Sequence, residues 1–160
     1  MQMDARHNTG KFVIRVYGIL INDRKEVLLS DEYRFGMEMT KFPGGGLKFG
    51  EGPEDCIRRE AIEEFGQPVD IISHFYTTGF YQEAMFFDNH QLISIYYRIS
   101  LPDPVSFNIA GKPFDFPELI DGSQSFRWKD INELTSDDLT FPVDKVVAEI
   151  LRNKFKTGKG

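Results

Sequence analysis

Short apolar runs, separated by turn residues, recur along the chain. They are rich in β-branched and aromatic residues, which favour extended backbone. The runs predict five strands, at Phe12–Ile21, Glu26–Ser30, Val69–Thr77, Leu92–Ser100 and Ser125–Lys129. The first is almost continuously apolar, which predicts a central strand covered on both faces. In Leu92–Ser100 the alternation of Ile93, Ile95, Tyr97 and Ile99 predicts a half-buried strand with these side chains on one face.

Two segments have the features of helices instead. Pro53–Phe65 begins with a proline and two acidic residues and is followed by Gly66, as a helix start and a helix end favour. Pro142–Phe155 has an apolar stripe at helical spacing, which predicts packing against a core. Strands interleaved with two helices predict the α+β class, as an α/β/α sandwich around a mixed β-sheet.

The length of 160 residues fits one domain, residues 1–160, and no repeat or linker interrupts it. The short polar ends, residues 1–9 and 156–160, are expected to be flexible. The segment between Leu101 and Ser125 is rich in Pro, Gly and Asp and predicts a long loop of the kind often found near a functional site.

Composition and charge exclude several classes of protein. Cys56 is the single cysteine, so no internal disulfide forms, and a lone thiol fits a reducing cytoplasm. The N-terminus lacks the apolar core of a secretion signal, and no apolar run approaches the ~20 residues of a membrane span. The net charge of −6 argues against nucleic acid as a partner. An acidic protein can still bind phosphates through a metal ion.

The helix at Pro53–Phe65 has an unusual placement of acids. Glu60, Glu63 and Glu64 share one face, where like charges destabilise a helix by about 0.2–0.5 kcal/mol per pair. A cation would offset this repulsion, and Mg²⁺ prefers such oxygen ligands together with substrate phosphates. Arg59 lies beside the acids and could orient them. The alternative interpretation is a solvated, glutamate-rich helix face.

Residues 42–67 resemble the Nudix box, G-x5-E-x7-R-E-U-x-E-E-x-G-U, where U is a bulky aliphatic residue. Its fixed letters are filled by Gly45, Glu51, Arg59, Glu60, Glu63, Glu64 and Gly66. Ala61 and Gln67 depart from the two aliphatic positions, which concern helix packing rather than chemistry. The resemblance makes the solvated-face interpretation improbable.

The resemblance implies a Nudix hydrolase of the MutT-like or ADP-ribose pyrophosphatase-like kind, with the Nudix fold. Such enzymes use Mg²⁺, with Mn²⁺ as an alternative, to hydrolyse a nucleoside diphosphate linked to another group, such as ADP-ribose or a (d)NTP. The metal ligands it implies are Glu60 and Glu64, with Glu63, Glu51 and the Gly45 carbonyl as further ligands. Glu63 and Glu64 have catalytic roles by the same pattern, and Arg59 orients the carboxylates.

The general base varies within this family and often comes from a separate loop. Glu118 and Asp121, in the long loop, are the first candidates, followed by Glu83 and Asp88. The alternative interpretation is that each of these four residues is an ordinary acid on the protein surface.

Three residues are candidates for substrate binding. Arg34 lies in Glu32-Tyr33-Arg34, which resembles a Gln-Tyr-Arg found at a similar place in ADP-ribose pyrophosphatases. Arg15 interrupts an apolar strand and points either to an edge or into the cleft. Phe42 directly precedes the box. The aromatics Phe80, Tyr81, Phe86 and Phe87 could stack on a nucleobase, although most of the 15 Phe must lie in the core.

Rival functions stay open at this stage. One is a Nudix-like sensor that binds a nucleotide sugar without turnover, and another is a hydrolase of a non-nucleotide diphosphate. The expected partner is a small nucleoside diphosphate derivative, with no nucleic acid and no membrane, in a cytoplasmic protein. A homodimer and a monomer are both compatible with the sequence.

Overall fold

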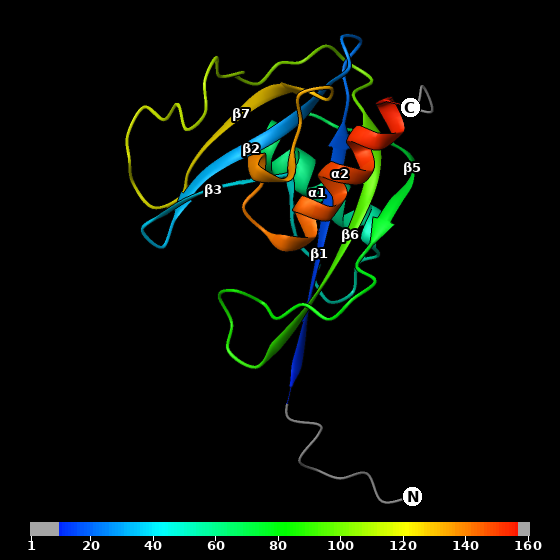
Figure 1. Cartoon of the computed structure of the whole chain (residues 1–160), viewed down its shortest axis with the longest axis vertical. Helices are drawn as coiled ribbons and strands as arrows, with labels where there is room; N and C mark the ends of the chain where they lie inside the picture. Colours follow the sequence, from blue (N-terminus) through cyan, green and yellow to red (C-terminus); the bar gives the residue numbers. More distant parts are fainter. Residues whose placement is uncertain (1–9, 157–160) are drawn as a thin grey trace, which may run out of the picture.

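The computed structural model of the chain describes residues 10–156. Its elements in chain order are β1 (Lys11–Leu20), β2 (Glu26–Arg34), β3 (Met37–Lys41), β4 (Gly44–Gly46), α1 (Pro53–Phe65), β5 (Asp70–Thr77), β6 (His90–Ser100), β7 (Ser123–Asp130), the 3₁₀ turn η2 (Ser136–Asp138) and α2 (Pro142–Lys156). Figure 1 shows their arrangement.

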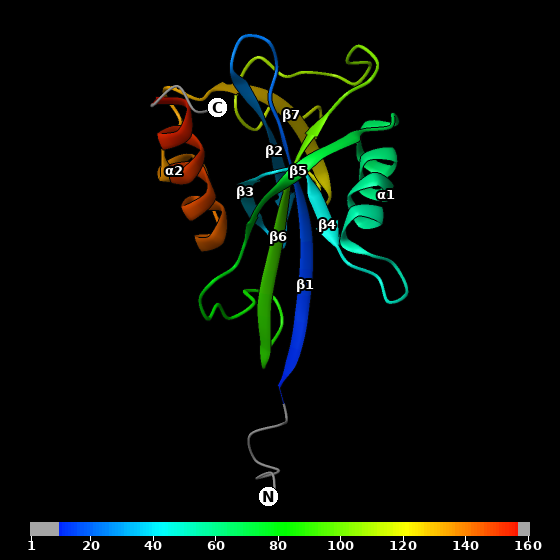
Figure 2. The ribbon, with the colours of Figure 1, turned by 90° about the vertical axis from the view of Figure 1, so that its right-hand side faces the viewer.

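The strands form two sheets. In the first, of order β4-β1-β6-β5, β1 pairs in parallel with β6 and antiparallel with β4. In the second, of order β3-β2-β7, all pairs are antiparallel. Helices α1 and α2 lie on opposite sides of these strands (Figure 2). The architecture is the expected α+β sandwich with a mixed sheet between helices.

Strand β1 contributes to a hydrophobic core on each of its faces. Val16 and Leu20 pack in the core closed by α1, whereas Tyr17 and Ile19 pack in the core closed by α2. Successive side chains of a strand point to opposite faces, so a strand buried on both faces must be apolar at consecutive positions. The prediction of a central strand covered on both faces is therefore confirmed.

Helix α1 has the predicted bounds. Pro53 occupies its first turn, and Gly66 ends it in the left-handed conformation with φ 70°. Glycine adopts this conformation at no steric cost. The start of α1 fixes where the acidic residues of the box lie relative to the strands. Among the helices within residues 10–156, none is long and apolar enough to cross a membrane.

Strand β2 is longer than predicted, and the sequence predicts neither β3 nor β4. Asp31 is fully buried, and its carboxylate accepts hydrogen bonds from the Thr40 hydroxyl of β3 and the Arg127 guanidinium of β7. The polar residues that end the apolar run thus continue the strand, because their charges are paired by neighbouring strands.

The prediction of one covered face in β6 is confirmed only in part. Ile99 is buried and Ile93, Ile95 and Tyr97 are half-buried, but Ser94 and Tyr96 on the opposite face are buried as well. Both faces of β6 are covered, because Tyr96 packs in the core closed by α2 and Ile99 in the core closed by α1, so the alternation of apolar residues does not mark a single buried side.

The ends of the chain differ from the expectation at one residue. Helix α2 extends to Lys156, which was expected to belong to a flexible end. The other residues of the expected flexible ends, residues 1–9 and 157–160, lie outside the described residues.

Candidate active site

Strand β4 brings the glycines before α1 against the carboxylate of Glu60. Gly45 pairs with Val16 of β1, and a Cβ added at Gly45 would lie 2.2 Å from Glu60 Oε1. No real Cβ contact is that short, so any other residue here would displace the carboxylate. The glycine of the motif is therefore explained by the close approach of backbone to Glu60.

Arg59 binds the acids of the motif into one network. Its guanidinium donates to both oxygens of Glu51, with Nη2 to Oε1 at 2.6 Å and Nε to Oε2 at 3.0 Å. Nη1 donates to Glu60 Oε1 at 3.0 Å and to Glu63 Oε2 at 3.2 Å. Nη2 also donates to the Gly46 carbonyl at 3.0 Å. The fork of donors fixes the loop before α1 to the face of α1.

The same network changes the acidity of Glu51. The hydrogen bonds from Arg59 and from the backbone N–H of Lys48 lower the pKa of Glu51 to about 2. Glu51 is therefore ionised near neutral pH, and it holds Arg59 in place.

Glu64 lies apart from Arg59, on the side of α1 that faces the strands. Gln124 of β7 donates to its Oε1 at 3.5 Å, and the backbone N–H of Gly44 is near enough to lower its pKa slightly. Burial raises the pKa of Glu64 to about 7, and the charge of Glu60 adds to this increase while Lys41 opposes it. A carboxylate in this environment is stabilised by a nearby positive charge.

The donors present fit a hard divalent cation in kind. The charge of Glu60 lies close enough to disfavour that of Glu64, and all candidate ligands are carboxylate or carbonyl oxygens. Within residues 10–156, however, no group of three or more His, Cys, Asp or Glu side chains is gathered as a metal cluster. Glu51, Glu60 and Glu63 are instead paired with Arg59.

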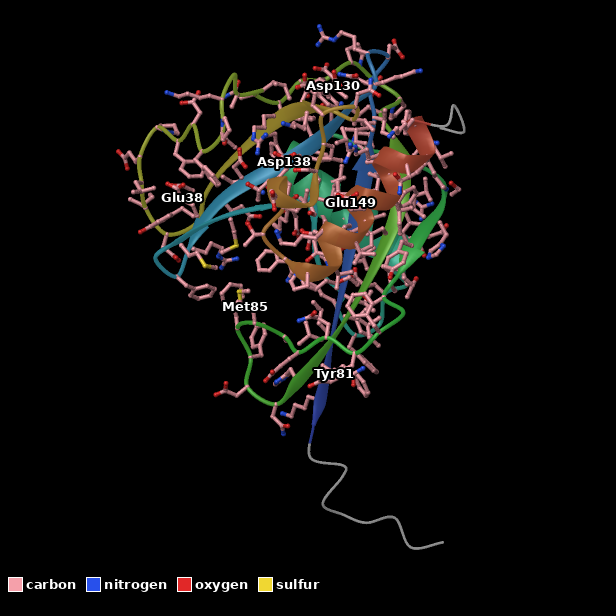
Figure 3. The ribbon with its side chains drawn as sticks, viewed as in Figure 1. Glu38, Tyr81, Met85, Asp130, Asp138 and Glu149 are labelled. Atoms are coloured by element: carbon pink, nitrogen blue, oxygen red, sulfur yellow. The ribbon has the colours of Figure 1, made fainter. Side chains whose placement is uncertain are left out.

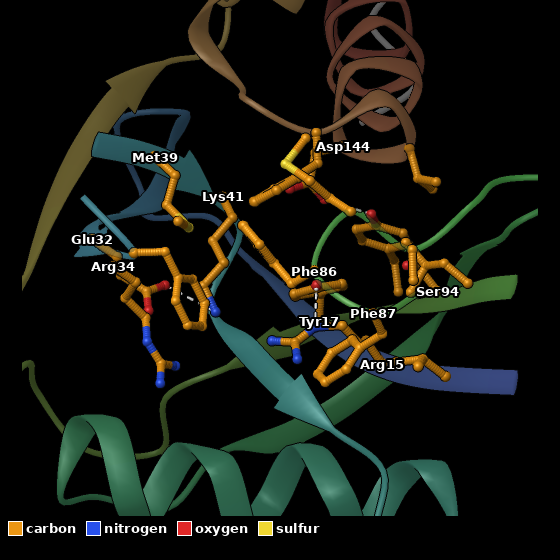
Figure 4. A pocket seen from close by; sticks show the side chains of 18 residues that line it. Arg15, Tyr17, Glu32, Arg34, Met39, Lys41, Phe86, Phe87, Ser94 and Asp144 are labelled. Atoms are coloured by element: carbon orange, nitrogen blue, oxygen red, sulfur yellow. Dashed lines mark hydrogen bonds and ion pairs between the residues drawn. The ribbon is translucent and has the colours of Figure 1, made fainter. Parts of the chain in front are cut away.

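A pocket of about 190 Å³ lies between α1 and the start of α2 (Figure 4). Side chains from β1, β2, β3, β6, the β5–β6 loop and the N-terminal end of α2 line it. Its walls include the aromatic side chains of Tyr17, Phe35, Phe86, Phe87, Tyr96 and Phe141. Such a mixture of apolar walls and a few polar groups is typical of small-molecule sites.

Asp144 is the most deeply buried acid of the pocket. Its Oδ1 accepts a hydrogen bond from the Tyr96 hydroxyl at 2.5 Å, and its Oδ2 has no partner in the described part of the chain. Burial raises the pKa of Asp144 to about 7, although the Tyr96 hydroxyl, the charges of Lys41 and Arg15 and the backbone N–H of Phe42 lower it. An unpartnered buried oxygen is costly, which makes Oδ2 a candidate acceptor for a ligand.

Three basic residues, Arg15, Arg34 and Lys41, line the same pocket. Lys41 is buried, forms an ion pair with Glu32 at 2.9 Å and donates to the Gly44 carbonyl at 3.3 Å. Burial lowers its pKa. Arg15 Nε donates to the Tyr17 hydroxyl at 2.7 Å.

The candidate substrate residues differ in placement. Arg15 and Arg34 line the pocket. The expectation that Phe42 binds substrate is wrong, because its side chain is fully buried in the core and does not line the pocket. Its ring lies edge-on to the Tyr96 ring, with 6.0 Å between the centroids. Of the aromatics, Phe86 and Phe87 line this pocket and Phe80 and Tyr81 do not.

The four candidate bases lie on exposed loops. Asp121 Oδ1 accepts from the Phe35 N–H at 2.9 Å, and the Glu118 carbonyl accepts from the Ser123 hydroxyl. Glu83 pairs with Gln91 through a β-bridge, and Asp88 lies in the same loop. In residues 10–156, no described hydrogen bond or ion pair joins any of the four to α1. Figure 3 labels Tyr81 and Met85, which lie on either side of Glu83 in the sequence, on the loop between β5 and β6.

Sequence reasoning missed Lys41, Asp144 and Tyr17 as residues of the pocket. Lys41 directly precedes Phe-Pro-Gly in the sequence. Asp144 interrupts the apolar start of α2. A charge inside an otherwise apolar segment is the available signal for these two residues, as it is for Arg15.

Comparisons with known proteins were consistent with this geometry. A family model described as NUDIX domain matches residues 11–150. An RNA pyrophosphohydrolase of Acinetobacter baylyi is 43% identical over 58 residues, which are 34% of this chain and 34% of that protein. The chain thus spans about a third of the length of this curated relative.

Similar solved structures cover nearly the whole chain. The solution structure of the E. coli ORF135 protein has a TM-score of 0.66 at 17% identity and covers 93% of this chain and 94% of that one. A NUDIX hydrolase from Nitrosomonas europaea has a TM-score of 0.64 at 19% identity, with 93% and 91% covered. A MutT protein from Methanosarcina mazei has a TM-score of 0.64 at 17% identity, with 92% and 98% covered. At these identities the likeness concerns the fold.

Proposed function

Because the chain belongs to the Nudix family, we propose that it hydrolyses the pyrophosphate bond of a nucleoside diphosphate derivative, with Mg²⁺ or Mn²⁺ as its cofactor. The observation that supports this best is the junction of the box with the pocket. Lys41 lines the pocket and contacts Gly44, whose N–H in turn lies near Glu64. The pocket therefore adjoins the strand that precedes the acids of α1.

The acids of the box have separate roles in this proposal. Glu60 and Glu64 would be the main metal ligands, with Glu63, Glu51 and the Gly45 carbonyl as further oxygen donors. A divalent ion there neutralises phosphate charge and makes its bound water more acidic. Arg59 holds Glu51, Glu60 and Glu63 in fixed orientations. Glu63, Glu64 and Glu118 are the candidates to accept the proton of the attacking water.

The pocket would hold the nucleoside part of the substrate. Phe86 and Phe87 offer aromatic surfaces for a flat ring, and Asp144 Oδ2 can accept an N–H at the buried end. Arg34, exposed at the β2–β3 turn, and Arg15 provide positive charge for the phosphates.

The similar proteins have different activities in their names, among them RNA pyrophosphohydrolase, MutT and UDP-X diphosphatase. The proposal therefore leaves nucleotide sugars such as ADP-ribose and (d)NTPs as alternative substrates. A cytoplasmic location and a choice between monomer and homodimer belong to the same proposal, and size-exclusion chromatography with light scattering distinguishes the oligomers.

A phosphate-release screen tests the function. The protein with Mg²⁺ is incubated with (d)NTPs, ADP-ribose, dinucleotide polyphosphates, sugar nucleotides and a non-nucleotide diphosphate, and products are separated by chromatography. We expect turnover of at least one nucleotide.

Glu64→Gln is the matched variant for this screen. It keeps the size of the side chain and removes its charge, so turnover should fall by at least about 10²-fold through loss of metal-based catalysis. The melting temperature should change little. Unchanged turnover in Glu64→Gln contradicts the assignment of the metal site, and silence across the panel with nucleotide binding retained favours a sensor.

A further inference from the structure

Arg15 and Lys41 lie between the pocket and the strand that leads into α1. Arg15 pairs with Gly46 of β4, and Lys41 donates to the Gly44 carbonyl at the other end of β4. Figure 4 shows the side chain of Lys41 extending toward α1 and the guanidinium of Arg15 pointing toward Lys41. The two cations thus lie in the pocket wall beside β4, the strand that precedes the acids of the box.

The guanidinium of Arg15 has donors to spare. Only its Nε has a described acceptor, the Tyr17 hydroxyl, and its two Nη groups have none within residues 10–156. Arg15 is half-buried and lines the pocket. A guanidinium fork with free donors in a partly desolvated site is suited to bidentate binding of a phosphate.

Lys41 adds a second positive charge at the same place. Glu32 is its described ion-pair partner, and its ammonium lies 5.8 Å from the centroid of the Tyr17 ring. Burial and then the charge of Arg15 both lower the pKa of Lys41, whereas Glu64, Asp144 and Glu60 raise it. Two like charges near each other and away from water are stabilised by an anion between them.

We propose that Arg15 and Lys41 form an anion site that holds the phosphate of the nucleoside monophosphate half of the substrate, while the nucleoside occupies the aromatic pocket. This inference rests on the proposed function. It assigns to Lys41, an otherwise structural partner of Glu32, a direct contact with the ligand. It also implies that the nucleoside monophosphate binds without any metal ion.

Binding in EDTA separates this anion site from the metal site. Wild-type protein is titrated calorimetrically with AMP, GMP, CMP and UMP, and with the four corresponding nucleosides. We expect at least one monophosphate to bind more tightly than its nucleoside. Loss of hydrogen bonds to a charged group should make Arg15→Gln bind that monophosphate about tenfold or more weakly, with the affinity for the nucleoside unchanged.

Lys41→Met alone would leave Glu32 as a buried, unpaired charge, so the informative variant is the double substitution Glu32→Gln, Lys41→Met. It should also lose affinity for the monophosphate but not for the nucleoside. Arg24→Gln is the matched control, because Arg24 is an exposed arginine in the turn before β2 that pairs with Glu26. Its affinity should equal that of the wild type.

The outcomes divide the possibilities. Equal affinity for monophosphate and nucleoside in the wild type, or unchanged monophosphate affinity in both variants, overturns the proposal. A parallel loss of nucleoside affinity and melting temperature assigns the two residues a structural role and also overturns it. Because these measurements use neither metal nor turnover, they stand apart from the phosphate-release screen, whose failure would concern the proposed hydrolysis.

Discussion

At the scale of single residues, Gly45 is important because any side chain at this position would displace the Glu60 carboxylate. The nearest atom to an added Cβ is the end of a flexible glutamate, so the fold can accommodate the change by moving Glu60. The same movement would break the contact between Glu60 and Arg59. The effect of a methyl group here should therefore be larger on chemistry than on stability.

We predict that Gly45→Ala lowers turnover by about tenfold or more while the free energy of unfolding falls by only about 1 kcal/mol. Steady-state kinetics and urea denaturation measure the two effects. Gly52→Ala serves as control, because an added Cβ at Gly52 lies 3.6 Å from Asp55 Oδ2, an ordinary contact, and φ is −79°. Equal losses of activity in both variants would contradict the role assigned to Gly45.

Asp144 makes the stability of the protein depend on pH. Its pKa is about 7 in the folded state and about 3.8 when exposed, so between these values the folded state binds more protons than the unfolded state. The free energy of unfolding therefore falls as the pH rises from about 4 to about 7 and then levels off. Arg15 and Lys41, which face Asp144, limit the size of the effect.

Asp144→Asn should remove this contribution while keeping an oxygen for the Tyr96 hydroxyl. From pH ~4 to pH ~8, the wild type should lose at most about 4 kcal/mol of unfolding free energy relative to Asp144→Asn. Urea denaturation across this range measures it. Glu64 changes stability in the same direction, but it is present in both proteins and cancels. A difference that does not vary with pH would contradict the prediction.

At the scale of elements, β2 shows how a buried strand can have a polar sequence. Asp31 contacts Thr40 of β3, Arg127 of β7 and the backbone N–H of Phe114 in the long loop. The Asp31 to Arg127 distance is 2.7 Å, and both side chains are nearly inaccessible to water. This one carboxylate joins three separate parts of the chain.

We predict that Arg127→Leu destabilises the protein by about 3–5 kcal/mol, because it leaves the Asp31 carboxylate buried without its counter-charge. Adding Asp31→Asn should recover part of this loss, since an amide still accepts from Thr40 and needs no counter-charge. Equilibrium unfolding of the single and double variants measures the difference. A double variant less stable than Arg127→Leu would contradict this account.

At the scale of the whole molecule, the acidic charge is concentrated at the box. Residues 51–64 contain six acids and two bases, so −4 of the net charge of −6 lies in this segment. Arg59 pairs with three of these acids. The acidity that argued against a nucleic-acid partner is thus the feature expected to attract a divalent cation.

Mg²⁺ is predicted to raise the melting temperature, because a ligand of the folded state stabilises it by about 2.7 kcal/mol at a hundred times its Kd. Differential scanning fluorimetry with Mg²⁺ or with EDTA measures the shift. The double variant Glu60→Gln, Glu64→Gln should lose the shift. The same increase in wild type and variant would place the cation elsewhere on the protein.

The sequence by itself determined the class of fold, the bounds of α1 and the resemblance of residues 42–67 to the Nudix box. These features are local: strand periodicity, the proline and glycine at the ends of a helix, and acids one turn apart all act within a few residues. Arg15 could be selected in the same way, because a charge inside an apolar strand is visible without neighbours.

Only the tertiary structure decided the rest of the site. Lys41, Asp144 and Tyr17 come from three different elements and meet because β1, β3 and α2 pack together. The same packing placed Phe42 in the core rather than the pocket. Strand β3 and the second half of β2 depend on charge pairs between strands. Which buried charges find partners is a property of contacts distant in sequence, and no local pattern contains it.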